Sequence, residues 1–196
     1  MKMNIKNKSL VYKQCITALC VAMNIIGSFV AMGLRLPVYL DSMGTVLISG
    51  IFGLRYGVIT GILSNLINGI SFDVYSFYYI PVQIFTACMA SYVMRSKWSS
   101  GWRSIFGAMV ISVPVSFVSA CITAVVFGGI TSSGSSYLVL VLRKAGMGLT
   151  FSCFVVQMIT DYLDKLITIF LVRIVMKRAI SGKIIQQERT KDTNSF

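Results

Sequence analysis

Three ionisable residues interrupt a mostly apolar run near the C-terminal end of the sequence. Asp161, Asp164 and Lys165 lie between Met147 and Val172. A charge at the centre of a bilayer costs about 2.5 to 3.5 kcal/mol on insertion scales, so such residues face protein or water and mark function by default. Asp161 and Lys165 are four residues apart and can pair on one helical face. The cluster either binds a ligand or only holds a helix bundle together.

Three other segments combine aromatic and polar side chains, at residues 35–41, 71–79 and 128–134. Aromatic rings with a few convergent polar groups are what a small-molecule pocket needs, although tyrosine is also expected in an interfacial belt without any ligand. Asp41, with Ser42 beside it, is expected either to cap a helix or to contact ligand. The candidate substrate-binding residues are Tyr39, Asp41, Asn65, Asn68, Asp73, Tyr75, Tyr78, Gln83, Thr131, Gln157, Asp161, Asp164 and Lys165. For the asparagines and glutamines, hydrogen bonding between helices is the alternative.

The residue types present exclude several kinds of chemistry. The chain has no histidine, which excludes histidine acid–base catalysis, Ser-His or Cys-His nucleophiles and imidazole metal sites. It has no G-x-x-x-x-G-K-[ST] motif and therefore no P-loop ATPase of its own. Asp161 and Asp164 have the D-x-x-D spacing of membrane CDP-alcohol phosphotransferases, but the rest of that family's pattern is missing. We therefore expect no enzyme, no cofactor and no metal.

The composition is that of a membrane protein. The 196 residues are 56% hydrophobic and 12% charged, against about 25% charged in an ordinary soluble domain. Too little polar surface remains to cover a water-soluble globule. The formal net charge of +12 would suggest nucleic acid on a soluble basic face, but here the basic residues lie between apolar runs. Nucleic acid is therefore not an expected partner, whereas the lipid bilayer is.

The apolar runs predict an all-α integral membrane bundle of six transmembrane helices. We place them at residues 11–33, 41–54, 57–72, 79–95, 104–127 and 147–176. The second and third reach only about 20 to 25 Å, less than the 30 Å or so of a hydrocarbon core. Their connecting segments should then lie inside a protein-lined cavity. One transmembrane domain over residues 1–180 and a polar cytoplasmic tail over residues 181–196 are expected.

The basic residues predict the orientation in the cell membrane. In this arrangement fourteen of the 18 Lys and Arg residues lie on one side, Arg35, Arg143 and Lys144 lie on the other, and Lys165 lies within the last helix. The positive-inside rule then makes both termini of this multi-pass protein cytoplasmic. The three aromatic segments share the outer side, which favours a pocket over a belt.

With these features the chain resembles the S component, the substrate-binding membrane subunit, of energy-coupling factor (ECF) vitamin transporters. The resemblance covers about residues 10–178 and includes the length near 200, the six predicted helices with cytoplasmic ends and the motif Ala18-x-x-x-Ala22. It also includes residues 39–47 (YLDSMGTVL) and 53–67 (GLRYGVITGILSNLI). The stretch from Asp161 to Lys165 is similar to a subset of these proteins.

The resemblance implies a transport mechanism without covalent chemistry. An S component binds a vitamin or related water-soluble micronutrient from outside and then topples in the membrane against a coupling subunit (T component), driven by two cytoplasmic ECF ATPases, as part of an ABC transporter. Ala18 and Ala22 would contact that coupling subunit, although this spacing is also typical of internal helix packing. Asp41, Asp161 and Asp164 favour a polyol or cation over an anion as substrate. The alternative is a stand-alone ion-coupled secondary carrier or channel that uses Asp161 and Asp164.

Overall fold

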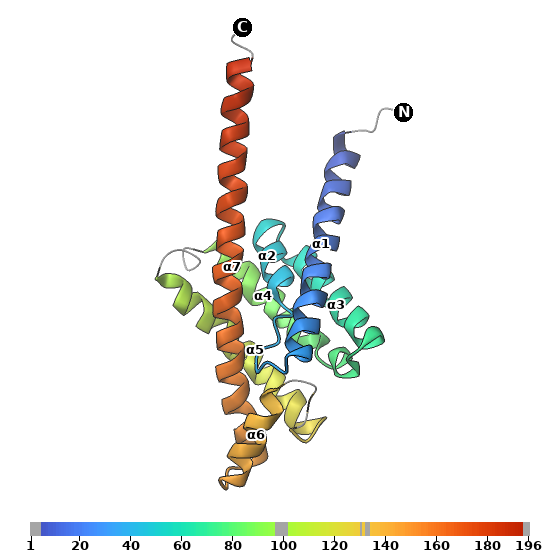
Figure 1. Cartoon of the computed structure of the whole chain (residues 1–196), viewed down its shortest axis with the longest axis vertical. Helices are drawn as coiled ribbons and strands as arrows, with labels where there is room; N and C mark the ends of the chain where they lie inside the picture. The colour runs from blue at the N-terminus through green and yellow to red at the C-terminus, as the bar shows by residue number, and fades with distance from the viewer. Residues whose placement is uncertain (1–4, 97–101, 130, 132–133, 194–196) are drawn as a thin grey trace.

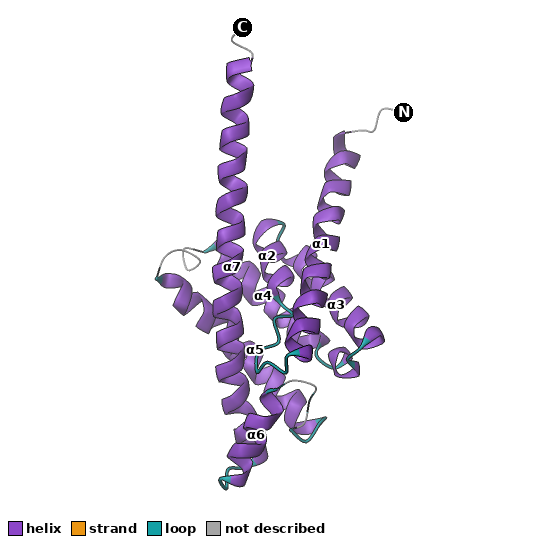
Figure 2. Cartoon of the chain, viewed as in Figure 1, coloured by secondary structure: helices purple, strands orange, loops and turns teal. Residues whose placement is uncertain are grey.

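The computed structural model describes residues 5–96, 102–129, 131 and 134–193. In these ranges the chain is all-helical, with seven α-helices, one short 3-10 helix and no strand (Figure 2). The elements in chain order are α1 (Ile5–Gly33), α2 (Met43–Ile51), α3 (Leu54–Ser71), η1 (Val74–Phe77), α4 (Ile80–Arg95), α5 (Arg103–Val125), α6 (Ser135–Lys144) and α7 (Leu149–Thr193). The predicted all-α fold class is confirmed.

The two long helices α1 and α7 lie on either side of the short helix α2 (Figure 1). Helices α1 and α7 both extend past the bundle at the end where the two termini lie, and α6 lies against α7 at the opposite end (Figure 1). Helix α2 contacts α1, α3, α4 and α7, while α5 packs along α7. Helix α2 is therefore surrounded by other helices, and the linker 34–42 joins it to α1.

Two glycines allow the short helices to pack as they do. A side chain at Gly44 would collide with the backbone carbonyl of Cys20, so glycine permits the close contact between α1 and α2. Gly53 separates α2 from α3 and has φ of +92°, a left-handed conformation that suits glycine. The core beside these contacts is aliphatic and includes Val46, Ile48 and Ile111, all of them fully buried.

Two of the described helices are long and apolar enough to cross a membrane, by length and composition. They are Leu10–Gly33, within α1, and Arg103–Val125, which is α5. Large apolar side chains also face outward from other helices, for example Ile70 on α3 and Phe170 on α7. An apolar exterior of this kind is consistent with a membrane-associated protein.

The structure differs from the prediction at α6 and at the end of α7. No helix was expected between residues 127 and 147, yet α6 occupies ten residues there. It is too short to cross a bilayer, so a search for apolar spans does not detect it. Helix α7 does not end near residue 176 but continues for 45 residues in all, so the polar tail is helical as far as Thr193.

Candidate functional site

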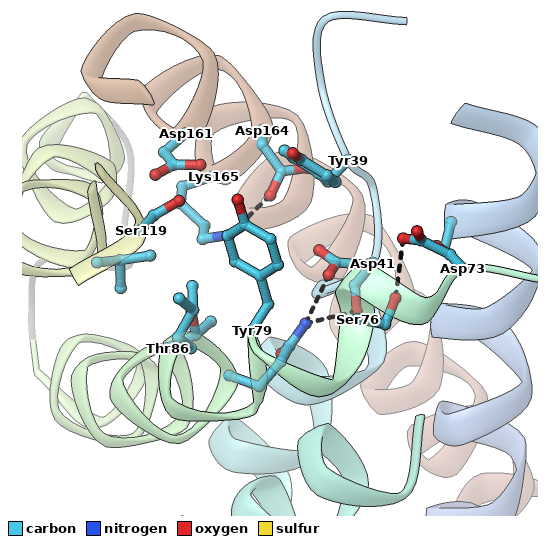
Figure 3. A pocket seen from close by; sticks show the side chains of 14 residues that line it. Tyr39, Asp41, Asp73, Ser76, Tyr79, Thr86, Ser119, Asp161, Asp164 and Lys165 are labelled. Carbon is cyan, nitrogen blue, oxygen red and sulfur yellow. Dashed lines mark hydrogen bonds and ion pairs between the residues drawn. The ribbon is translucent and has the colours of Figure 1, made fainter. Parts of the chain in front are cut away.

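A small polar cavity lies among α1, the linker 34–42, the segment around η1, α4, α5 and α7. Its volume is about 30 Å³, enough for about two water molecules. The lining residues are Ser28, Tyr39, Asp41, Asp73, Ser76, Tyr79, Val82, Gln83, Thr86, Val115, Ser119, Asp161, Asp164 and Lys165 (Figure 3). The structure thus brings seven of the thirteen predicted substrate-binding residues together around one cavity.

Asp164 and Lys165 attach the linker 34–42 to α7. The Lys165 ammonium lies 2.7 Å from Asp164 Oδ2 and donates to Ser42 Oγ at 2.8 Å. Asp164 also accepts from the Ser42 hydroxyl at 3.0 Å and from the backbone N–H of Leu40 at 3.1 Å. Leu40 has φ of +52°, an uncommon conformation for a leucine. The side chains of Asp164 and Lys165 therefore satisfy each other and fix the loop that covers the cavity.

The spacing allowed an ion pair between Asp161 and Lys165, but the structure pairs Lys165 with Asp164 instead. Although Asp161 and Lys165 lie one helical turn apart, the ammonium turns to the neighbouring Asp164. The flexible four-carbon stem of a lysine reaches in either direction, and Ser42 supplies a further partner on the Asp164 side. The linker residue Ser42 therefore favours Asp164 over Asp161 as the partner of Lys165, and the spacing of residues along α7 gives no information about that linker.

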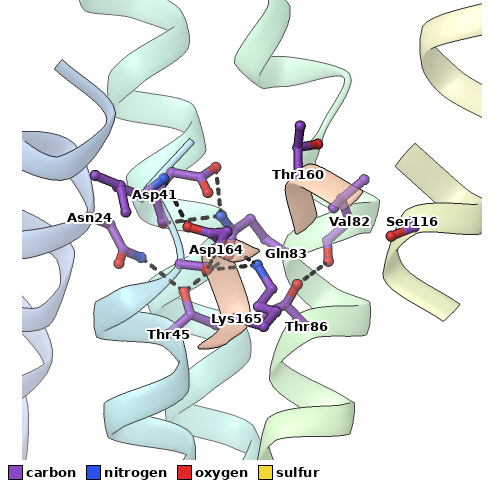
Figure 4. Close-up of polar contacts among 12 residues, drawn as sticks. Asn24, Asp41, Thr45, Val82, Gln83, Thr86, Ser116, Thr160, Asp164 and Lys165 are labelled. Atoms are coloured by element: carbon purple, nitrogen blue, oxygen red, sulfur yellow. Dashed lines mark hydrogen bonds and ion pairs between the residues drawn. The ribbon is translucent and has the colours of Figure 1, made fainter. Parts of the chain in front are cut away.

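Asp41 belongs to a hydrogen-bonded chain that links four elements. Gln83 Nε2 donates to Asp41 Oδ2 at 2.9 Å and to the Asp41 carbonyl at 3.1 Å. Gln83 Oε1 accepts from Thr45 Oγ1 at 3.1 Å, which in turn accepts from Asn24 Nδ2 at 2.9 Å. Figure 4 shows this chain running from α1 through α2 to α4 and the linker.

Asp41 does not cap α2, which answers the alternative left open by the sequence. Ser42 occupies the N-cap position, and the helix has no side-chain cap. Both side chains are engaged elsewhere, Asp41 with Gln83 and Ser42 with Asp164. Asp41 instead presents its carboxylate at the cavity wall.

Asp161 differs from the other two acidic residues because part of its carboxylate is unpaired. The residue is only 6% exposed, and its Oδ2 atom has no hydrogen-bond partner in the described part of the chain. It lines the cavity (Figure 3). Leaving a buried acceptor unsatisfied costs about 1 to 3 kcal/mol, and more for a charged group. Asp161 is therefore the strongest indication of a binding position in the structure.

Two tyrosine rings form an aromatic wall of the cavity. The ring centroids of Tyr39 and Tyr79 lie 6.0 Å apart with an interplanar angle of 42°. The Tyr39 hydroxyl is 3.2 Å from Thr131 Oγ1, and the Tyr79 hydroxyl is 2.6 Å from Thr123 Oγ1. Below them Asp73 accepts a hydrogen bond from Ser76 at 3.0 Å. Both rings line the cavity and are held at their hydroxyl ends, and the Tyr79 ring also stacks on Phe127 at 6.1 Å.

Six predicted binding residues do not line the cavity. They are Asn65, Asn68, Tyr75, Tyr78, Thr131 and Gln157. Tyr75 and Tyr78 pack edge-on against Phe127, with centroid distances of 4.8 and 5.1 Å. Thr131 and Gln157 lie behind the wall. Thr131 is hydrogen-bonded to the lining residue Tyr39, and Gln157 donates to Thr123, which is hydrogen-bonded to the lining residue Tyr79.

Asn65 and Asn68 are buried in α3, and their side-chain amides form no hydrogen bond among the described residues. Each is 1% exposed, and neither the amide nitrogen nor the amide oxygen of either residue has a partner in the described part of the chain. Interhelical hydrogen bonding, the alternative to ligand contact for these two residues, is therefore absent in the described part of the chain. The asparagine that does bond between helices is Asn24, which donates to Thr45 and Ser64.

Sequence reasoning missed half of the cavity wall. The missed lining residues are Ser28, Ser76, Tyr79, Val82, Thr86, Val115 and Ser119. Single serines, threonines and valines in apolar helices are too common to stand out. Tyr79 had a usable signal, because it ends the aromatic segment 71–79 two residues before Pro81, at the start of α4.

Ala18 and Ala22 lie on the outward face of α1. Both are exposed, as are their neighbours Leu19, Ile26 and Phe29. In this chain the two alanines therefore do not mediate internal packing. The face is apolar, and within it Phe29 also contacts Phe72 of the α3–η1 connection.

The site holds binding groups and no metal-ligand cluster. Among the described residues no group of three or more acidic or cysteine side chains is placed to hold a metal ion.

Comparison of the chain with protein-family models, with curated proteins and with solved structures found no match. Function must therefore be inferred from the cavity and its chemistry.

Proposed function

We propose that this chain is the substrate-binding S component of an ECF-type importer, with six membrane spans and cytoplasmic termini, which captures a small micronutrient from outside. The observation that carries the proposal is the buried Asp161 carboxylate on the cavity wall, whose Oδ2 atom has no hydrogen-bond partner in the described part of the chain. Around it lie two tyrosine rings and a set of side-chain hydrogen-bonding groups. Convergent polar groups in an aromatic setting are the general form of a ligand site.

The helix arrangement supports the membrane part of the proposal. Helices α2 and α3 are short; α2 is surrounded by other helices, and the outer faces of the bundle, including that of α3, are apolar. The linker 34–42 lies at the end of α1 farther from the N-terminus (Figure 1). If the basic segments are cytoplasmic, this linker and the cavity beneath it face outward.

The cavity must widen for a vitamin-sized ligand. Its volume of about 30 Å³ is far below the roughly 300 to 1,000 Å³ of ordinary small-molecule pockets. The linker 34–42 is the part that would have to move, because it supplies Tyr39 and Asp41 and is held to α7 mainly through Asp164. Ligand entry is then coupled to rearrangement of the outer loop.

The exposed face of α1 is where we place the coupling subunit. A bulky residue at Ala22 should block docking in lipid, where close helix approach depends on small side chains. Ala22→Trp is therefore expected to prevent co-purification with the T component and ATPases while leaving substrate binding intact. Ala145→Trp, at another exposed alanine, is the matched control. Equal co-purification of both variants would contradict the docking assignment.

Uptake into proteoliposomes tests the proposal as a whole. The substrate is first identified by mass spectrometry of small molecules that co-purify with the protein. The S component reconstituted with T component and ATPases should then accumulate this substrate only with ATP. Uptake driven by an ion gradient without the ATPases would instead support the stand-alone carrier. That alternative has less structural support, because Asp164 is already paired with Lys165 and only Asp161 is left as a relay.

A further inference from the structure

The cavity carries an excess of negative groups. Four carboxylates line it, from Asp41, Asp73, Asp161 and Asp164, against the single ammonium of Lys165. That ammonium is paired with Asp164. The three other carboxylates form no ion pair within the described part of the chain, although the charge of Lys165 also acts on Asp41 and Asp161. The wall as a whole therefore has a formal charge of about three negative units to be compensated.

The hydrogen bonds show which carboxylate is left for a ligand. Asp73 is engaged by Ser76 and Asp41 by Gln83. Asp161 alone combines burial, an unpaired oxygen and a position on the cavity wall. In a site of low dielectric constant such a group is matched best by a positive charge that also donates hydrogen bonds.

The aromatic wall favours the same kind of ligand. Tyr39 and Tyr79 both line the cavity with Asp161, and their rings are tilted against each other at 6.0 Å. The face of a tyrosine ring attracts an ammonium group within about 6 Å. Carboxylate and ring can therefore act on one cationic head group together.

Resting on the proposed function, we infer that the substrate of this site is an organic cation, with its ammonium-type group against Asp161 and a flat or apolar part on Tyr39 and Tyr79. An anion is disfavoured because Lys165 already donates to Asp164 and Ser42. A neutral polyol could use the carboxylates as acceptors but leaves their charge uncompensated. The present cavity of about 30 Å³ accommodates only the head group, and the rest of the ligand enters as the linker 34–42 moves.

Three probes of matched size and different charge test this inference. They are 2-phenylethylamine as the cation, 2-phenylethanol as the neutral analogue and phenylacetate as the anion. Binding to the full-length protein in nanodiscs is measured by isothermal titration and by the shift in melting temperature, without any partner subunit. The amine is expected to bind at least about tenfold more tightly than the other two, because a charge-assisted hydrogen bond exceeds the tenfold threshold of 1.4 kcal/mol. An amine that binds no better than the alcohol or the acid overturns the inference.

Substitutions on one helix separate binding from folding. Asp161→Asn should weaken amine binding about tenfold or more, and it should fold normally because it removes an unpaired buried charge. Asp161→Glu should retain the preference for the amine. Asp192→Asn, roughly 45 Å farther along α7, removes a charge without affecting binding. Amine affinity in Asp161→Asn equal to that of Asp192→Asn would place the cation elsewhere and refute the assignment.

The outcome is distinguishable from a failure of the proposed function. Selective amine binding together with uptake that does not depend on ECF ATPases would retain the cation site and reject the S-component proposal. ATP-dependent uptake of a neutral or anionic substrate would retain the S component and reject the cation site.

Discussion

The pair formed by Asp164 and Lys165 should contribute strongly to stability, and a double-mutant cycle can measure it. Asp164→Asn retains an acceptor for the Leu40 N–H but removes the carboxylate 2.7 Å from the ammonium of Lys165, a residue that is 3% exposed. Removing one partner of a buried pair costs about 3 to 5 kcal/mol. At about 2 to 4 °C per kcal/mol for a chain of this length, the melting temperature should fall by roughly 6 to 20 °C.

The double variant should lose less free energy of unfolding than the sum of the losses in the two single variants. Lys165→Met alone leaves the Asp164 carboxylate with hydrogen-bond donors but no cation, so it should cost a similar 3 to 5 kcal/mol or so. Asp164→Asn combined with Lys165→Met leaves no buried charge at this position. Its cost should be about 1 to 3 kcal/mol, the scale of one imperfect buried hydrogen bond. The coupling between the two positions is therefore expected to exceed about 2 kcal/mol.

Unfolding can be followed through the protein's own cysteines. Cys20 and Cys153 are buried, so a thiol-reactive dye reports their exposure on heating the detergent-solubilised protein. Lys144→Met, at an exposed lysine on α6, is the control and should change stability by no more than about 0.5 kcal/mol. Additive single and double variants, or an Asp164→Asn melting temperature equal to that of Lys144→Met, would refute the buried pair.

Three further substitutions test packing and buried polar groups by the same melting measurement. Gly44→Ala should destabilise the protein by about 1 to 3 kcal/mol, because its Cβ collides with an α1 carbonyl. The control Gly33→Ala, which has open space around it, should not destabilise the protein. Equal effects of the two substitutions would contradict the close contact at Gly44. Tyr79→Phe should cost about 1 kcal/mol through its lost 2.6 Å hydrogen bond, whereas Tyr78→Phe, at an exposed ring, should be neutral. Asn68→Leu should raise the melting temperature, since it removes a buried amide without partners; a fall would show that the amide is satisfied.

Helix positions were predictable where the chain alone decides them. The apolar runs at α1 and α5 are continuous, and burial in any apolar medium makes such runs helical. The shortness of α2 and α3 was also visible, because Gly53 and the polar residues around Asp73 interrupt the pattern. Helix α6 was missed because Ser135 and Ser136 on its buried side look like loop residues.

The site was predictable in its composition more than in its arrangement. Asp161 was recognised because a charge in an apolar run is costly wherever it lies. Tyr39 and Tyr75 looked equivalent, yet the first lines the cavity and the second packs on Phe127. Only the path of the linker and of η1 distinguishes them.

The sequence by itself determined that the chain is helical and rich in apolar surface, that histidine chemistry is excluded, and that acidic residues stand in an apolar helix. These properties depend on residue type and local spacing. Only the tertiary structure decided that Lys165 pairs with Asp164, and that Asp161 lines a cavity with one carboxylate oxygen lacking a hydrogen-bond partner among the described residues. The physical reason is that Ser42 and the Leu40 N–H, more than 120 residues away in the chain, supply the partners that commit Asp164.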